Sequence, residues 1–399
     1  MKSAASFLAI AVSLAAAPVV AQTTITIWGN DNPQPSATEI LSAEFDAMRD
    51  DVVVEYRQIP FSDLNEEYMR AFATNSAPDI LMVNTTDTHF YASSGVLLDL
   101  TDRIAASDII DFDEIFPGYQ AAVTFEGRIY EVPRGANTLM IYVNSAMAEA
   151  AGIDPVDAPE SWTEFYDYAQ RLTNADSRVF GIAFSAKNNQ EGPWQWLPFA
   201  RMAGAEWDRI NEPGAVRALE MWRDFVVNGL ASQEVLVWSQ GDAADSFRAQ
   251  RAAMVIQGSW DVANMVAAPF EWNLWMLPPE EVGGLRVSAA GDFTYAVAAA
   301  SDAPDLAFEV IEYIYSQDNR IWNEFSRMPA RAVSPENPNY PEAYEAFIGQ
   351  LQYGRVLGPN ARWNDVSVAL QTAIQASLSG AAEPADALER AAAEIAAID

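Results

Sequence analysis

Tryptophan and hydrogen-bonding side chains occur together where the sequence changes from strand-forming to turn-forming residues. The first such place is Trp28-Gly29-Asn30-Asp31, which follows the β-branched run TTITI (23–27). An indole can stack on the apolar face of a flat ring, while Asn and Asp exchange hydrogen bonds with hydroxyls at its rim. The combination favours noncovalent binding of a sugar-like molecule. Neighbouring Gly, Pro, Asn or Asp residues also flank Trp194, Trp196, Trp260 and Trp363.

Any one of these tryptophans could equally be a core or hinge residue, so the inference depends on the group. Two others, Trp162 and Trp222, lie within helical apolar stripes, and we expect them in the core.

Residues for covalent or metal chemistry are scarce. His89 is the only histidine and there is no cysteine, which excludes thiol nucleophiles, disulfides and metal sites built on His or Cys. Neither a G-x-S-x-G elbow nor a glycine-rich phosphate loop occurs. A glycosidase that uses a pair of carboxylates remains an alternative. Because the chain has 56 acidic residues, the presence of any one pair is only weak support for it. We expect no catalytic residue, no metal and no cofactor.

The N-terminal residues of the chain point to export. Residues 1–21 combine Lys2, an apolar run and small residues before Gln22, which is typical of a cleavable signal peptide. Without cysteine no lipid can be attached at the cleavage site. The net charge of −33 disfavours nucleic acid and anionic membranes as partners. We expect a monomeric periplasmic protein that is not lipid-anchored.

The elements that would position the polar loops alternate between strand and helix. Strand patterns at 23–28, 52–56 and 79–83 are separated by helical patterns at 36–48 and 62–77. Such alternation predicts a parallel sheet, whose ligands lie at the carboxyl ends of the strands. Residues 28–31 and 84–87 both follow strand ends, so the two loops could face one cleft.

Six segments in order resemble the family-1 extracellular solute-binding proteins of ABC sugar importers, a maltose-binding-protein-like family. They are SAPDILMV…YASSGVLLDLTD (76–102), EGRIYEVPRGANTLMIYVN (126–144), AGIDPVDAPESWTEF (151–165), AMVIQGSWD (253–261), MPAR (328–331) and the closing AIQASLSGAAEPADALERAAAEI. The resemblance implies an α/β fold with two lobes, each a mainly parallel sheet flanked by helices, around a ligand cleft (periplasmic-binding-protein type II). It implies a first lobe of 22–133 with 291–331, and a second of 134–290 with 332–399.

The resemblance also implies a set of ligand-binding residues. Asn137 occupies the position at which the family has a glutamate on the hinge side of the cleft. This difference puts in doubt whether the ligand presents the same pattern of hydroxyls as the family's ligands. The implied set is Trp28, Asn30, Asp31, Thr86, Asp87, Asn137, Trp194, Trp260, Asp292, Phe293, Arg331, Arg362 and Trp363.

The resulting hypothesis is a periplasmic binding protein that carries a mono- or disaccharide, or a related glycoside or polyol, to an inner-membrane ABC permease. Arg134, Arg331 and Arg362 leave an anionic sugar derivative (a sugar acid or a sulfonated or phosphorylated glycoside) as an alternative. A secreted glycosidase, or an adhesion or structural protein without a cleft, is less favoured. The sequence does not specify the sugar, its affinity or the permease.

Overall fold

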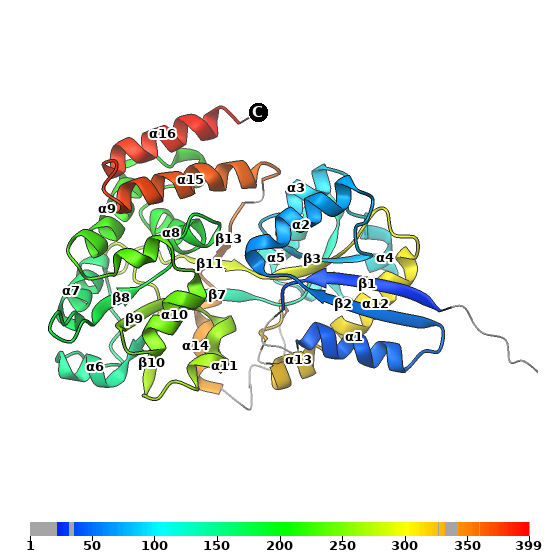
Figure 1. Ribbon diagram of the computed structural model, residues 1–399, viewed down its shortest axis with the longest axis horizontal. Helices are drawn as coiled ribbons and strands as arrows, with labels where there is room; N and C mark the ends of the chain where they lie inside the picture. The colour runs from blue at the N-terminus through cyan, green and yellow to red at the C-terminus, as the bar shows by residue number, and fades with distance from the viewer. Residues whose placement is uncertain (1–21, 32–35, 326, 332–340, 359, 399) are drawn as a thin grey trace, which may run out of the picture.

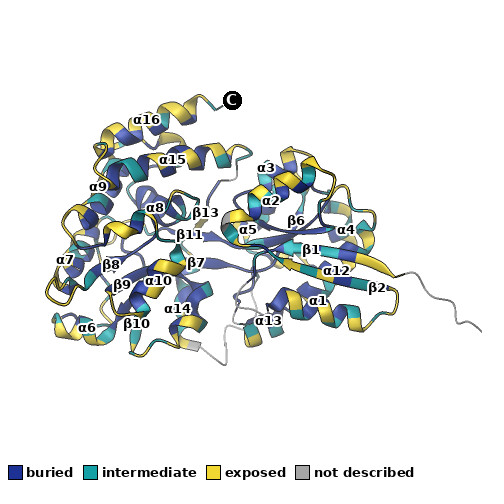
Figure 2. Ribbon diagram, viewed as in Figure 1, coloured by how far each residue is buried: buried dark blue, intermediate teal, exposed yellow. Residues whose placement is uncertain are grey.

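The computed structural model describes residues 22–31, 36–325, 327–331, 341–358 and 360–398. The predicted signal peptide at residues 1–21 lies outside them. Two α/β lobes lie side by side, each with its own sheet (Figure 1). The inner strands of the two sheets are mostly buried, β1 and the edge strand β2 are partly exposed, and the outward faces of the helices are exposed (Figure 2). Each lobe has a core of its own.

The first lobe contains a five-stranded sheet in the order β2-β1-β3-β12-β6. Its strands are β1 (Thr23–Gly29), β2 (Val52–Gln58), β3 (Ile80–Asn84), β6 (Glu131–Pro133) and β12 (Phe293–Val297). Alternate residues of β3 enter different cores: Ile80 and Met82 pack with α1 (Ala37–Ala47) and α12 (Pro304–Ser316), whereas Leu81 and Val83 pack with α2 (Phe61–Ala73) and α3 (Thr88–Ser93). Helices therefore cover both faces.

The second lobe contains a six-stranded sheet in which β13-β11-β7-β9-β8 are neighbours and β10 also pairs with β7. Its strands are β7 (Asn137–Asn144), β8 (Phe180–Ala183), β9 (Ala252–Gly258), β10 (Trp272–Trp275), β11 (Ser288–Gly291) and β13 (Gly354–Val356). One face packs on α7 (Trp162–Leu172), α8 (Glu191–Met202), α9 (Pro213–Val227), α15 (Trp363–Leu378) and α16 (Pro384–Ala396). The other packs on α10 (Gln240–Arg248), α11 (Val262–Met265) and α14 (Pro341–Leu351).

Shorter elements complete the lobes: α4 (Thr101–Ala106), α5 (Pro117–Val123), α6 (Ser145–Ala150), α13 (Asp318–Phe325), and the hairpin of β4 (Thr124–Phe125) with β5 (Arg128–Ile129). Trp162 and Trp222 lie in the second-lobe core as expected.

Within the predicted two-lobed α/β fold, the detail that both sheets are mainly parallel is wrong. β1 is parallel to β2 and β3, but β12 runs antiparallel to both β3 and β6. In the second sheet β7 is antiparallel to β9, β10 and β11. The reason is topological: β12 enters the first sheet directly from β11 of the other lobe, without the helical crossover that makes neighbouring strands parallel.

The segments between the sheets form a narrow connection. The chain passes from β6 to β7 through residues 134–136, and from β11 to β12 through Asp292. Residues 327–331 lie beside them, since Met328 O accepts a hydrogen bond from Ala136 N and Arg331 forms a β-bridge with Ile115. Asp292, Arg134 and Arg327 thus meet where the lobes join.

Candidate ligand-binding cleft

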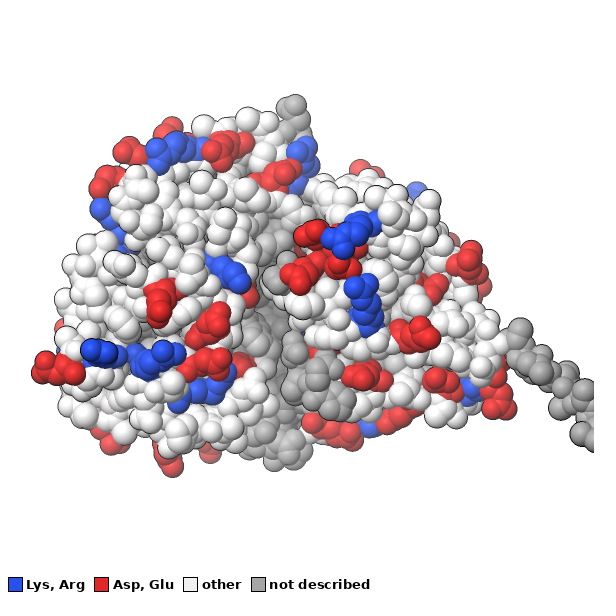
Figure 3. Space-filling view, in the orientation of Figure 1, with Lys and Arg blue, Asp and Glu red and all other residues white. Residues whose placement is uncertain are grey.

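A cavity of about 280 Å³ opens between the lobes beside these connecting segments. The first lobe contributes Asn30, Phe61, Asn84 and Phe293, and the second contributes Asn137, Gln190, Glu191, Trp194, Gln240, Gly241, Trp260, Ala263, Asn264 and Leu357. Arg134, Gly291, Asp292 and Arg327 form its hinge side. A groove separates the lobes in the space-filling view, where acidic residues are spread over the face with basic residues among them (Figure 3).

Two half-buried indoles line the cavity, and each lies against a glycine. A Cβ atom on Gly258, the last residue of β9, would stand 1.9 Å from the Trp260 ring. A Cβ on Gly291, the last residue of β11, would stand 2.6 Å from the Trp194 ring. Both glycines therefore leave room for an indole close to a strand end, in the wall of the cavity, and an indole there is a surface on which a ligand ring can stack.

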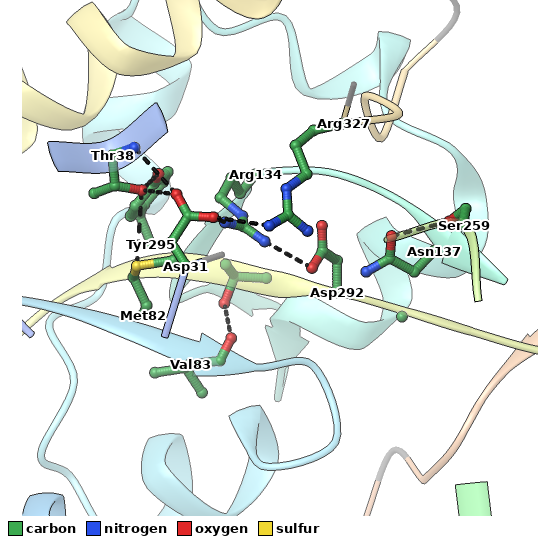
Figure 4. A network of polar contacts seen from close by, with 12 residues as sticks. Asp31, Thr38, Met82, Val83, Arg134, Asn137, Ser259, Asp292, Tyr295 and Arg327 are labelled. Carbon is green, nitrogen blue, oxygen red and sulfur yellow. Dashed lines mark hydrogen bonds and ion pairs between the residues drawn. The ribbon is translucent and has the colours of Figure 1, made fainter. Parts of the chain in front are cut away.

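A buried ionic cluster forms the hinge side of the cavity (Figure 4). Arg134 donates from Nη1 to Asp31 Oδ1 at 2.6 Å and from Nη2 to Asp292 Oδ1 at 2.9 Å. Arg327 Nη2 donates to the same Asp31 oxygen at 3.1 Å, and Thr38 donates to the other from its backbone and its hydroxyl. Two arginines thus face two aspartates, and the cluster has no net charge when all four are ionised.

The electrostatics of the cluster keep Asp31 ionised. Burial alone would raise the pKa of Asp31, but the attraction of Arg134 and Arg327 and the hydrogen bonds from Thr38 together outweigh it and hold that pKa below its ordinary value. Burial likewise opposes the charge of Arg134, and Asp292 and Asp31 raise the Arg134 pKa in spite of it. An added anion would therefore compete with carboxylates that already neutralise both arginines.

Four buried polar atoms of residues that line the cavity have no hydrogen-bond partner within the described part of the chain: Arg134 Nε, Trp194 Nε1, Gln240 Nε2 and Asp292 Oδ2. Asn137 adds an amide nitrogen that points toward Asp292, because Ser259 donates to its Oδ1 at 3.1 Å (Figure 4). Buried polar atoms are normally satisfied. A ligand hydroxyl, which both donates and accepts, suits this mixture of donors and a carboxylate acceptor.

Gln190 joins the lobes at the far side of the cavity. Its Oε1 accepts from Thr86 Oγ1 at 3.0 Å, and its Nε2 donates to Asp87 Oδ1 at 3.2 Å and Asn364 Oδ1 at 2.9 Å. Thr86 and Asp87 follow β3 of the first lobe, whereas Asn364 begins α15 of the second. Burial raises the pKa of Asp87 to about 6, and the Gln190 hydrogen bond opposes that rise.

Six of the predicted site residues line the cavity: Asn30, Asn137, Trp194, Trp260, Asp292 and Phe293. Asp31 adjoins it through the arginines. Asp87 lines a neighbouring hollow, and Thr86 contacts the same Gln190 side chain.

The other four predicted residues, besides Asp31, Thr86 and Asp87, are also absent from the cavity lining and have partners elsewhere. Trp28 packs on the α2 side of the first sheet, with Arg57 over its ring at 4.4 Å. Arg331 pairs with Asp318 and Glu114, Arg362 pairs at the surface with Asp365, and Trp363 is 1% exposed in the second-lobe core. Trp196 is also a core residue. A glycine or asparagine next to a residue in the sequence therefore does not indicate whether its side chain lies in the cleft or in the core.

The sequence reasoning missed Phe61, Gln190, Glu191, Gln240 and Arg327. The pair Gln190-Glu191 directly precedes Gly192-Pro193-Trp194. Its position at the beginning of the helix that carries Trp194 was the signal that could have identified both residues. Arg327 precedes the MPAR segment, but no local pattern distinguishes it from a surface arginine. Arg134 was considered for an anionic ligand, and the structure pairs it with Asp31 and Asp292 instead.

The described residues hold no group of three or more His, Cys, Asp or Glu side chains arranged to bind a metal ion. In the same part of the chain, every helix is too short or too polar to cross a membrane.

Residues 30–321 match the model of a family described as bacterial extracellular solute-binding protein. The chain is 22% identical to the galactooligosaccharide-binding protein of Bacillus subtilis (strain 168) over 393 residues, covering 92% of this chain and 87% of that protein. It is 26% identical to the sn-glycerol-3-phosphate-binding periplasmic protein UgpB of Escherichia coli O1:K1 over 299 residues, 70% of this chain and 66% of that protein. An ABC transporter solute-binding protein of Thermotoga lettingae TMO, crystallised with alpha-D-tagatose, has the same fold, with a TM-score of 0.82, 19% identity and coverage of 94% of this chain and 99% of that one.

Proposed function

The chain belongs to the family of bacterial extracellular solute-binding proteins, and from this we propose that it binds a neutral mono- or disaccharide, glycoside or polyol and delivers it to an ABC permease. The ligand lies in the cavity between the lobes, with its rings against Trp194 and Trp260. Asp292, Asn137 and Gln240 exchange hydrogen bonds with its hydroxyls. Relatives that carry galactooligosaccharide or tagatose support this class of ligand.

The observation that favours a neutral ligand is the pairing of both cavity arginines with carboxylates. Arg134 and Arg327 are 3% and 10% exposed at their side chains and share Asp31, while Asp292 pairs with Arg134. Removing one partner of such a buried pair is costly, so a phosphate or carboxylate would gain little by displacing an aspartate. The likeness to a glycerol-3-phosphate-binding protein keeps an anionic sugar derivative as the second candidate.

The proposal includes the cellular setting and the boundaries of the lobes. Residues 1–21 are removed on export to the periplasm, and the mature monomer carries no lipid. The lobes comprise 22–133 with 291–331 and 134–290 with 332–399, a division that the strands of the two sheets support except at Gly291, which ends β11 of the second sheet. The lobes close on the ligand by bending at the connecting segments, and the closed form engages the permease. The protein performs no chemistry on its ligand.

Calorimetric titration of protein lacking residues 1–21 tests the proposal. The panel comprises neutral hexoses, disaccharides and polyols beside glycerol phosphate, hexuronates and hexose phosphates. We expect at least one neutral compound to bind with negative heat-capacity change and to be recovered intact. Binding restricted to the anionic compounds would favour the second candidate, cleavage of a bound glycoside would favour a glycosidase, and silence across the panel would contradict both binding proposals.

A further inference from the structure

Asp87 is a carboxylate that lies where the two lobes meet. It follows β3 of the first lobe, and it is 7% exposed. Within the described part of the chain its side chain accepts one hydrogen bond, from Gln190 Nε2 at 3.2 Å. Gln190 directly precedes α8 of the second lobe. The hydrogen bond to this carboxylate therefore comes from the opposite lobe.

The space beside Asp87 is bounded by both lobes. It is a hollow of about 340 Å³, and its second-lobe wall consists of Asn189, Gln190, Asn364, Val368 and Gln371. Part of this wall belongs to α15, which begins across the groove from α2 and α3 (Figure 1). Separation of the lobes would take this wall away and open Asp87 to water.

The first lobe surrounds Asp87 with groups that carry no positive charge. Among the described residues that line the hollow, none is an arginine, lysine or histidine. The titratable groups that α2 and α3 bring to its lining are Tyr68 and Tyr91. Behind them Thr88 Oγ1 donates to Glu131 Oε2 of β6 at 2.7 Å, and Asp87 repels the charged form of this second carboxyl group. A charge on Asp87 therefore meets buried surroundings and an acidic neighbour.

The charged groups of the second lobe near this contact are engaged with one another. Lys187 attracts Glu191 and Asp242, and Arg362 pairs with Asp365 at 2.7 Å. What reaches Asp87 from this lobe is the neutral amide of Gln190. Joining the lobes therefore buries the charge of Asp87 without bringing an opposite charge to it, which disfavours the ionised form.

The joined and the separated lobes differ in how tightly Asp87 holds a proton. Burial raises the pKa of Asp87 from its ordinary value of 3.8 to about 6, although the Gln190 hydrogen bond opposes the rise. In separated lobes the carboxylate faces water, and its pKa returns toward the ordinary value. Because the joined lobes bind the proton more tightly, joining becomes more favourable as pH falls from about 6 to about 4. Above this window Asp87 is ionised in both arrangements, and below it Asp87 is protonated in both.

We propose that Asp87 couples closure of the lobes to the uptake of a proton, so that the protein holds its ligand more tightly in mildly acidic surroundings than at neutral pH. The inference rests on the proposed function in one respect, namely that the lobes close when ligand binds. It adds a dependence on pH that the proposed function does not contain.

The test counts the protons taken up when ligand binds. Protein lacking residues 1–21 is titrated calorimetrically with its best-bound neutral saccharide, at about pH 5 and about pH 7.5, each in two buffers that differ in ionisation enthalpy. The difference in heat between the buffers gives the proton uptake. We expect close to one proton at the lower pH and close to none at the higher, with affinity rising by up to about tenfold per pH unit between pH 6 and pH 4.

Two variants assign the proton to its residue. Asp87→Asn keeps the shape of the side chain and can accept from Gln190, but it cannot titrate, so it should lose close to one proton of uptake. Glu131→Gln is the matched control: burial also shifts this carboxyl group, but its partners Thr88 and Thr294 belong to the first lobe, so closure leaves its surroundings unchanged. It should keep the uptake of the parent. His89 packs against Phe125 of the first lobe and is present in every variant.

The absence of proton uptake in the parent at about pH 5, or equal uptake in the parent and Asp87→Asn, would overturn the inference while leaving the proposed function intact. Failure of the parent to bind any saccharide or anionic sugar would overturn the proposed function instead. Small-angle scattering without ligand then still tests the inference. The radius of gyration should fall between about pH 7.5 and about pH 5 in the parent and in Glu131→Gln but not in Asp87→Asn, and a constant radius in the parent would contradict the coupling.

Discussion

Trp260 lies so close to Gly258 that a Cβ atom there would stand 1.9 Å from ring atom Cζ3 and 2.2 Å from two other ring atoms. Gly258 has φ −98°, which any residue adopts, so the constraint is steric and not conformational. The position of the indole in the cleft therefore depends on a missing side chain on the strand beneath it.

Gly258→Ala should displace the Trp260 ring and weaken saccharide binding about as much as Trp260→Ala does, by roughly tenfold or more. Calorimetry with the best-bound saccharide measures the effect. Gly118→Ala is the control, because its added methyl group would meet nothing nearer than a Val356 methyl at 3.9 Å and Gly118 does not line the cavity. Unchanged affinity in Gly258→Ala would show that Trp260 does not contact the ligand.

Asp31→Asn should destabilise the protein by about 3–5 kcal/mol, because it leaves Arg134 and Arg327 buried without the carboxylate they share. The measurement is the free energy of unfolding in urea. Asp365→Asn removes the partner of the surface residue Arg362, and a change below about 1 kcal/mol is expected there. Similar losses of unfolding free energy in the two variants would show that burial does not increase the cost of removing an ion-pair partner.

Asp292→Asn should shift the ligand preference toward anions. The substitution removes one negative charge that faces Arg134 at 2.9 Å, and so leaves the cavity wall with an uncompensated positive charge. Titration with matched neutral and phosphorylated hexoses gives the ratio of the two affinities. A ratio equal to that of the parent would mean that Asp292 does not determine the charge of the ligand.

Glu131 should be protonated at neutral pH. The Thr294 hydroxyl has one proton but contacts both Val83 O, at 3.0 Å, and Glu131 Oε2, at 2.5 Å. A protonated Glu131 can donate to Thr294, which frees the Thr294 proton for Val83. In agreement, burial raises the pKa of Glu131 from its ordinary value of 4.5 to about 8.

Because the folded state holds this proton more tightly than the unfolded state, Glu131 should make stability fall as pH rises from about 4.5 to about 8. The slope from this one group is at most about 1.4 kcal/mol per pH unit. Glu131→Gln keeps the shape and cannot titrate, so its unfolding free energy, measured in urea across this range, should lack that component. Parallel pH profiles of parent and variant would contradict a raised pKa.

Gln190→Ala should favour separation of the lobes in the absence of ligand, since it removes the two hydrogen bonds that join Gln190 to Thr86 and Asp87 of the first lobe; its third hydrogen bond, to Asn364, lies within the second lobe. Each is worth about 0.5–1.5 kcal/mol. The radius of gyration from small-angle scattering should increase. Gln317→Ala, which removes a hydrogen bond within the first lobe to Ser316, is the control, and an equal radius in the two variants would argue against Gln190 as an interlobe contact.

Several helices and strands could be predicted because their patterns are local, whereas the division into two lobes was expected only from the family resemblance. β-branched runs bounded by turn residues gave β1, β2 and β3, and the stripe of Leu219, Trp222 and Phe225 gave α9. The antiparallel strands β7 and β12 were not predicted as such. Strand direction is set by which lobe the chain comes from, and no short segment contains that information.

The candidate cleft could be predicted only in part for a similar reason. Asn30 and Asp292 follow strand ends, and a sheet brings strand ends together. Trp363 has the same neighbours in sequence but lies in the core, because α15 turns that side chain toward the second-lobe interior. Arg327 reaches Asp31 from 296 positions away, a proximity that only the assembled connection between the lobes creates.

Because β12 lies between β3 and β6, completion of the first sheet depends on the order in which the strands are synthesised. β6 ends at Pro133 and β12 begins at Phe293, so the second sheet's strands β7 to β11 are translated between two neighbours of the first sheet. At about 5–20 residues per second, a ribosome needs on the order of ten seconds to cover that interval. Until then the N-terminal sheet lacks an interior strand, so the first lobe cannot complete its fold before the strands β7 to β11 of the second sheet have been synthesised.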